Sequence, residues 1–167
     1  FHLFYSGQQN SAFNGVGFII ATRLKAAVTN FDPGSDRLAV LHPNACAPMS
    51  LIVSYAPSEV SPDDAKDEFY ESLERVYSSI PKSRMILLMG DFNAEVGARR
   101  IGWEKEHGNF GHGSMNNNGL RLLSFAAAYR FGVANSWFRH HHKTTWRSND
   151  MQTRKQLEYI LISRRFG

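Results

Sequence analysis

The chain is short of cysteine, of charged residues and of long apolar runs. Cys46 is the one cysteine among 167 residues, which excludes an internal disulfide and a cysteine-rich zinc site. The longest apolar stretches, such as 85–89, fall far below the ~18 residues of a membrane-spanning helix. No basic segment with a following apolar core opens the chain, so secretion has no support. We expect no membrane association and an intracellular location, the nucleus included.

The composition is that of a folded protein with a mildly basic surface. Apolar residues make up 43% of the chain, aromatics 13% and charged residues 20%, which excludes a disordered chain, a collagen-like fibre and a coiled coil. The length, without repeats or linkers, predicts one domain over residues 1–167. The net charge is +4, and basic residues gather in the last third: Arg139, Lys143, Arg147, Arg154, Lys155, Arg164 and Arg165. This pattern suits a polyanionic partner such as nucleic acid, and an ordinary basic surface explains it equally well.

Strands alternate with two helices along the sequence, which predicts an α/β fold. Three strands are expected over 15–21, 37–42 and 50–55. A helix should follow, with Ser61 as its N-cap, Pro62 in its first turn and an apolar face of Phe69, Leu73, Val76, Tyr77 and Ile80. The acidic residues between Glu59 and Glu74 are interpreted as its solvated face. The apolar run 85–89 predicts an interior strand covered on both faces.

The second half predicts a long loop, a second helix and three further strands. The loop is expected over 97–117, where glycine, asparagine and histidine dominate. Asn118 is predicted to cap a helix over 119–129 whose inner face carries Leu120, Leu123 and Ala127. The remaining strands are expected over 132–137, 143–147 and 156–162.

The string Gly90-Asp91-Phe92-Asn93-Ala94, directly after the apolar strand, is the best candidate for a functional site. In an extended chain Asp91 and Asn93 would point the same way, with Phe92 packed on the other side. Ligands of open α/β sheets gather at the carboxyl ends of strands. A carboxylate there can act as a general base or a metal ligand, and an amide can donate to a phosphorane oxyanion. A simple turn that closes the strand explains the same string equally well.

Taken with other segments, this string resembles the signature of the endonuclease/exonuclease/phosphatase superfamily. Three further motifs agree in order: Ser54-Tyr55-Ala56-Pro57, the segment 118–126, and Thr144–Ser148 followed by Gln156–Leu161. The last of these is similar to the endonuclease domains of LINE-type retrotransposons and to animal proteins of the craniofacial development protein 2 family. The resemblance covers nearly the whole chain.

The resemblance implies an α/β fold of two mixed β-sheets packed in a sandwich, with helices on the outside. It also implies hydrolysis of phosphodiester bonds with Mg²⁺ or Mn²⁺, and nucleic acid, DNA first, as the partner. Asp91 matches the aspartate that orients or deprotonates the attacking water, and is a weak candidate for a metal ligand. Asn93 matches the asparagine that steadies the transition state. Tyr55 matches a phosphate-contacting tyrosine, with a plain structural hydrogen bond as the alternative.

The same resemblance assigns substrate-binding positions near the end of the chain. Thr145 stands where retrotransposon endonucleases place a threonine near the site. Trp146 stands where an aromatic flanks the DNA, with a core aromatic as the alternative. Arg147 belongs to the basic region that would hold the nucleic-acid backbone. The run His140–His142 lacks the spacing of a zinc site and is interpreted as solvated or facing nucleic acid.

Two departures from the family pattern put catalysis in doubt. Glu158 replaces the aspartate that orients the family's catalytic histidine, and its extra methylene matters because catalytic geometry tolerates shifts of ~1 Å poorly. No residue matches the family's metal-binding glutamate, its partner asparagine or its Ser-Asp-His. We therefore expect an incomplete domain, weak or inactive alone, from a metal-dependent endonuclease. A catalytically silent nucleic-acid-binding remnant and a phosphatase of the same superfamily remain as alternatives, and the oligomeric state is open.

Overall fold

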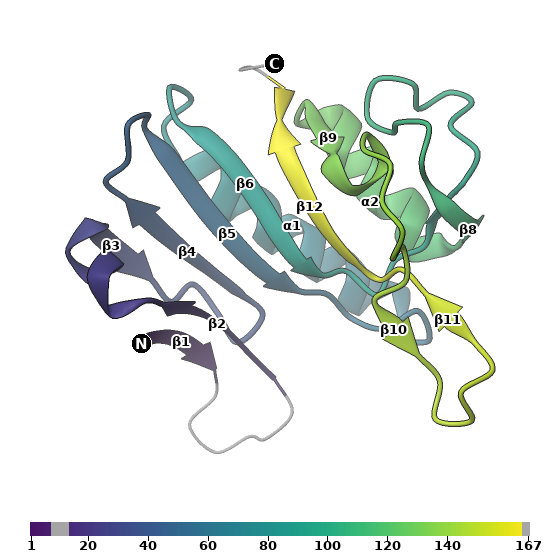
Figure 1. Cartoon of the computed structure of the whole chain (residues 1–167), viewed down its shortest axis with the longest axis horizontal. Helices are drawn as coiled ribbons and strands as arrows, with labels where there is room; N and C mark the ends of the chain where they lie inside the picture. The colour runs from purple at the N-terminus through teal and green to yellow at the C-terminus, as the bar shows by residue number, and fades with distance from the viewer. Residues whose placement is uncertain (8–13, 165–167) are drawn as a thin grey trace. The chain divides into compact units, whose positions relative to one another are not determined.

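The structure, a computed structural model, describes residues 1–7 and 14–164 (Figure 1). It divides into two compact units. Unit 1 comprises Phe1–Ala56 and Pro62–Met89, and unit 2 comprises Pro57–Ser61 and Gly90–Gly167. Each unit combines strands with a helix, and each is described by itself. Arg165, in the basic group above, lies outside the described residues. A single domain over 1–167 stays a prediction.

Unit 1 is built on strands that pair mainly in antiparallel fashion. Strands β1 (His2–Gly7) and β2 (Gly15–Ile20) pair as a ribbon that contacts β4 and β5. After the short 3₁₀ helix η1 (Thr22–Ala27), the strand order is β3 (Val28–Asp32), β4 (Leu38–Pro43), β5 (Met49–Tyr55) and β6 (Met85–Asp91). The predicted strands over 15–21, 37–42 and 50–55 are confirmed to within about a residue. The strand predicted over 85–89 is confirmed as β6, but its two faces are covered unequally, because Ile86 and Leu88 are buried while Met85, Leu87 and Met89 are half-buried.

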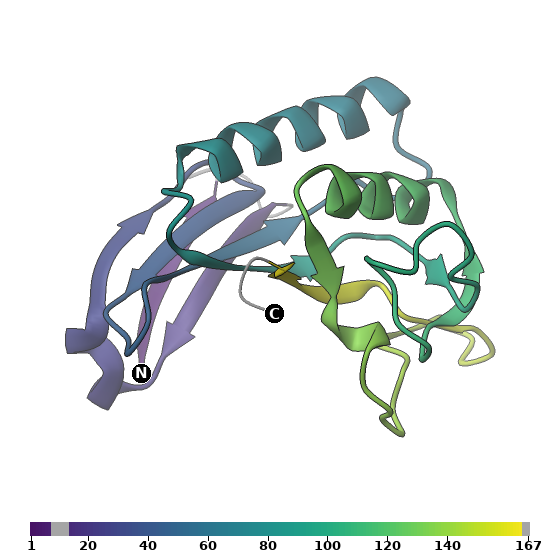
Figure 2. The same ribbon diagram turned by 90° about the horizontal axis from the view of Figure 1, so that it is seen from above.

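Helix α1 (Asp63–Ser79) runs along one face of the unit 1 strands (Figure 2). Phe69 and Leu73 are buried on its inner side, as their spacing predicted. The N-cap is Pro62 and not Ser61, because Pro62 keeps an extended ψ of 149° and the helix starts one residue later. No helix of the described residues is both long and apolar enough to cross a membrane.

The main elements of unit 2 are short antiparallel strand pairs and one α-helix. Its antiparallel pairs are β7 (Val96–Gly97) with β8 (His112–Met115), β9 (Phe131–Val133) with β12 (Glu158–Ser163), and β10 (Trp146–Arg147) with β11 (Arg154–Lys155). A 3₁₀ turn, η2 (Ala134–Ser136), ends the strand predicted over 132–137. The predicted loop over 97–117 is wrong, because it contains β8 and a fully buried His107 held between the carbonyls of Gly97 and Gly108.

Helix α2 (Asn117–Ala128) is capped by Asn116 and not by Asn118. The Asn116 Oδ1 accepts from the Gly119 N–H at 2.7 Å and from the Glu95 N–H at 2.8 Å. The predicted inner face is half wrong, since Leu123 is buried but Leu120 and Ala127 are exposed. Helix α2 has two neighbouring apolar faces. Because the helix packs against β7 and β9, the buried face is the one with Leu122, Leu123, Phe125 and Ala126.

We predict that Gly119→Ala destabilises the chain, although alanine is the better helix former by about 1 kcal/mol. A Cβ on Gly119 would collide with the carbonyl oxygen of Glu95. The overlap should lower the free energy of unfolding by about 1–3 kcal/mol, measured by urea denaturation with circular dichroism. The control Ser124→Ala, at an exposed position of the same helix, should change it by less than about 0.5 kcal/mol. A Gly119→Ala chain as stable as the parent would contradict the close approach of α2 to Glu95.

Candidate active site in unit 2

The site is built on a tight turn at the end of β6. Gly90 has φ 146°, a backbone conformation that favours glycine, and Asn93 has φ 47°, in the left-handed region that asparagine tolerates. The Asn93 N–H donates to Oδ1 of Asp91 at 2.8 Å. The extended geometry predicted for 91–93 is therefore wrong, and the turn that was its alternative is present. This turn fixes one oxygen of the Asp91 carboxylate.

Two buried apolar residues, Phe92 and Ala94, anchor the turn in the core of the protein. Phe92 and Ala94 are completely buried, which confirms that Phe92 packs away from the polar side. The Phe92 N–H donates to the carbonyl of Leu157 at 3.0 Å, directly before Glu158. The turn and the start of β12 are thus joined by a main-chain hydrogen bond.

The side-chain amide of Asn118 fastens the other side of the turn. Asn118 is buried, and its Nδ2 donates at 3.1 Å to the carbonyls of both Asn93 and Pro57. The carboxylate of Glu59 accepts from the N–H groups of Asn117 and Asn118 at 3.1 and 3.0 Å, where the positive end of α2 favours a negative charge. Sequence reasoning assigned Glu59 to the solvated acidic face of the first helix and missed this role.

Two carboxyl groups are coupled at the site. Burial raises the pKa of Asp91 above its ordinary value, against the opposing effect of the hydrogen bond from Asn93. Burial also raises the pKa of Glu158, and the negative charge of Asp91 raises it further. The Oε2 atom of Glu158 is buried with no hydrogen-bond partner, although the residue as a whole is partly exposed. Unpaired buried carboxylate oxygens are costly and recur at functional sites.

Thr145 fixes the start of β12. Its Oγ1 accepts from the N–H groups of Leu157 and Glu158 at 3.0 and 3.2 Å. The predicted threonine near the site is therefore next to Glu158 in the structure, in a positioning role. Arg147 is exposed, and its Nε donates to the carbonyl of Met151 at 3.1 Å within the β10–β11 hairpin.

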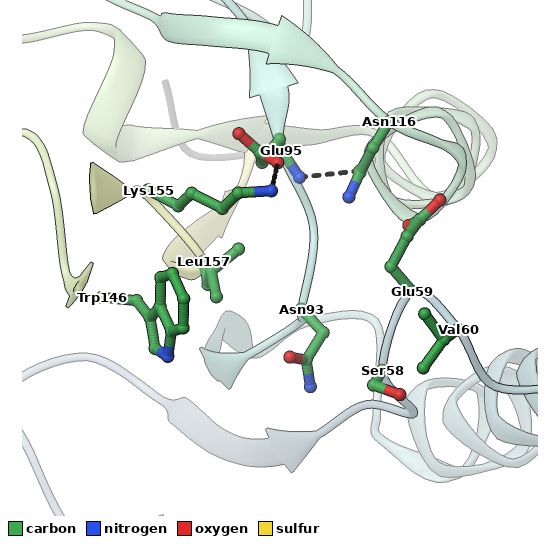
Figure 3. A pocket seen from close by; sticks show the side chains of 9 residues that line it. All are labelled: Ser58, Glu59, Val60, Asn93, Glu95, Asn116, Trp146, Lys155 and Leu157. Atoms are coloured by element: carbon green, nitrogen blue, oxygen red, sulfur yellow. Dashed lines mark hydrogen bonds and ion pairs between the residues drawn. The ribbon is translucent and has the colours of Figure 1, made fainter. Parts of the chain in front are cut away.

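A pocket of about 360 Å³ opens beside the turn (Figure 3). Trp146 forms one wall and is 42% exposed, so the alternative of a core aromatic is wrong. Lys155 and Glu95 form an ion pair at 2.5 Å across another part of the lining. The full lining is Ser58, Glu59, Val60, Asn93, Glu95, Asn116, Trp146, Lys155 and Leu157. Asn93 and Trp146, predicted from separate motifs, thus line one pocket.

Tyr55 belongs to unit 1 and is described there. The Tyr55 N–H donates to the Arg37 carbonyl at 2.9 Å, and the Arg37 guanidinium lies 5.3 Å from the centre of the tyrosine ring. The ring is half-buried. The phosphate-contacting role predicted for Tyr55 stays a prediction.

The residues present do not make a complete metal site. Hard cations such as Mg²⁺ take several oxygen ligands, and Asp91 and Glu158 supply two carboxylates. Over residues 1–7 and 14–164, no group of three or more histidine, cysteine, aspartate or glutamate side chains is arranged to hold a metal ion.

Comparison of the fold places this arrangement among known proteins. The chain superposes on an endonuclease/exonuclease/phosphatase family protein from Leptotrichia buccalis C-1013-b with a TM-score of 0.65, at 16% identity, over 98% of this chain and 59% of that one. The 3′ phosphatase NExo from Neisseria, solved with its product DNA hairpin, gives a TM-score of 0.64 at 16% identity over 98% and 66%. The chain has the endonuclease/exonuclease/phosphatase fold. The predicted fold class and the resemblance drawn from the motifs are confirmed.

Sequence comparison finds similarity to an animal protein. The chain is 30% identical to craniofacial development protein 2 of Bos taurus and 31% identical to that of Tragulus javanicus, in each case over 99% of its length. It spans less than a third of these relatives, 28% and 29% respectively. No protein-family model matches the chain.

We predict that Asp91→Asn lowers the pKa of Glu158, because the substitution removes a like charge that disfavours the ionised form. The measurement is an NMR titration of the glutamate side-chain carboxyl carbons without divalent cations. Glu104, whose pKa is lowered chiefly by backbone hydrogen bonds in its own turn, is the internal control and should not move. An unchanged Glu158 titration would show that the two carboxyls are not coupled.

Proposed function

We propose that the protein carrying this chain cleaves phosphodiester bonds in nucleic acid as an endonuclease, with DNA as the first candidate. The observation that carries the proposal is the Asp91–Asn93 turn. It presents a carboxyl of raised pKa next to an amide that lines a pocket walled by the exposed indole of Trp146. The fold is shared with the two solved proteins above, one of them a phosphatase bound to DNA.

Asp91 is suited to the role of base or water-orienting group. One of its oxygens is occupied by the Asn93 N–H, which holds the carboxylate in a fixed orientation. The second oxygen would accept a proton from water as the water oxygen bonds to phosphorus. The bond from phosphorus to the leaving oxygen breaks, and that oxygen takes a proton from solvent. A raised pKa makes the carboxylate a stronger base.

Asn93 and the neighbouring residues would bind the substrate. The side chain of Asn93 lines the pocket, from which its amide would donate to a phosphoryl oxygen as charge develops there. Trp146 offers an exposed aromatic face and Arg147 an exposed guanidinium on the same short strand. Together they would contact the base and backbone of a nucleic acid.

A divalent cation, Mg²⁺ or Mn²⁺, remains part of the proposal through the family resemblance. When bound, it would supply charge stabilisation at the phosphoryl oxygens. Because the described residues lack a complete ligand group, we propose that the 167-residue chain binds the cation weakly and cleaves weakly or not at all by itself.

A catalytically silent nucleic-acid-binding remnant is the second candidate. It is favoured by the same lack of a ligand group among the residues that the structure describes, and by Glu158, whose buried oxygen has no donor. A phosphatase that acts on small phosphates is less well supported. The exposed aromatic and basic residues around β10 suit a polymeric substrate better.

The test is nicking of supercoiled plasmid in Mg²⁺ by a longer protein that carries this chain, with the 167-residue chain in parallel. We expect nicking by the longer protein and little by the chain alone. Asp91→Ala should reduce the rate about 10²- to 10⁴-fold because the base is lost. Asp64→Ala, at an exposed position of α1, is the matched control and should leave the rate unchanged.

The outcomes separate the candidates. Undiminished nicking by Asp91→Ala would rule out the role given to that carboxyl. Salt-sensitive DNA binding without cleavage by either protein would favour the silent remnant.

A further inference from the structure

A loop that follows η2 combines solvent-exposed aromatic rings with positively charged side chains. We name residues 137–143 the aromatic–basic loop; it carries Trp137, Phe138, Arg139, His140–His142 and Lys143, and no acidic residue. Phe138 is 70% exposed and Trp137 is 43% exposed. Two neighbouring exposed rings leave apolar area in contact with water, and exposed apolar patches are typical of binding surfaces.

The ring of His140 ties the loop to one of two carbonyl groups, according to which ring nitrogen carries the proton. Its Nδ1 lies 2.9 Å from the carbonyl of His142, and its Nε2 lies 3.0 Å from the carbonyl of Asn135. Farther along the loop, the Lys143 ammonium donates to the Gly111 carbonyl at 3.4 Å. The exposed rings therefore belong to a segment held by hydrogen bonds, so less conformational entropy is lost when a ligand binds.

Asn135, whose carbonyl lies against the His140 ring, connects the loop to the candidate active site. The side chain of Asn135 accepts from the Ile160 N–H at 2.8 Å and donates to the Glu158 carbonyl at 3.4 Å. Asn135 precedes Trp137 by two residues. The aromatic–basic loop is thus tied to β12 beside Glu158, within unit 2.

Unstacked bases match this surface better than a duplex does. Base faces in a double helix are covered by their neighbours, whereas a single strand can lay each base on an aromatic ring. Arg139, exposed and adjacent to Phe138, would meet the phosphates of the same strand. An apolar protein partner would use the rings but not the surrounding cations. Charge and ring exposure together select nucleic acid.

We propose that the aromatic–basic loop binds single-stranded nucleic acid by stacking bases on Phe138 and Trp137. The proposal rests on the proposed function for its class of partner, but it requires no cleavage. It adds to that function a preference for unpaired strands on a surface separate from the Trp146 pocket lining.

The test measures binding of the 167-residue chain in EDTA to fluorescein-labelled oligonucleotides by anisotropy. Single strands of DNA and RNA are compared with a blunt duplex of the same sequence. We expect tighter binding of single strands, quenched tryptophan fluorescence, and roughly 5- to 100-fold weaker binding by Phe138→Ala. Phe138→Leu should also weaken binding, because it keeps apolar area without the aromatic face. Phe1→Ala, at an 89% exposed ring of unit 1, is the matched control and should bind like the parent.

Two results would overturn the proposal: equal binding of duplex and single strand, or parent-like affinity in Phe138→Ala with its fold verified by circular dichroism. The difference between the DNA and RNA arms identifies which single strand is preferred. Loss of plasmid nicking with this binding intact would count against the proposed hydrolysis alone. Loss of the single-strand preference with nicking intact would count against the aromatic–basic loop alone.

Discussion

The buried side-chain amide of Asn118 is the contact on which the candidate site depends. It donates both hydrogens, one to Pro57 and one to Asn93, and so joins the segment 57–61, the turn after β6 and the first turn of α2. Hydrogen bonds of a buried amide contribute more to the free energy of folding than the same bonds exposed to water. Breaking one would leave a buried polar group unpaired, at the cost of its desolvation free energy. This contact holds the turn whose Asn93 N–H in turn orients the Asp91 carboxylate.

The charged groups around the turn divide into those that stabilise it and those that do not. Glu59 neutralises the end of α2, and Lys155 pairs with Glu95 in the pocket lining. Asp91 and Glu158 instead repel each other in a partly desolvated place, and one oxygen of Glu158 has no donor. A pair of carboxyl groups that costs stability is typical of a site that carries chemistry.

Local patterns in the sequence predicted the strands, the α/β fold and the inward packing of Phe92, because each depends on periodicity or on one motif. They predicted Asn118 as the cap of α2, which is wrong: Asn116 caps the helix and also contacts Glu95, whereas Asn118 contacts Asn93. Glu59 was missed because its partner amides lie 58 residues or more along the chain. Side-chain-to-backbone bonds over such separations leave no local signal.

The central proposal is that unit 2 binds nucleic acid through two surfaces, the Trp146 pocket and the aromatic–basic loop. The most direct test is an NMR map of backbone amide shifts in the ¹⁵N-labelled chain, titrated with a short nuclease-resistant phosphorothioate single strand. The account predicts that the largest shifts fall at Asn93, Glu95, Trp146 and the loop 137–143. Shifts spread evenly over all basic residues, or concentrated on the β1–β2 ribbon, would contradict it.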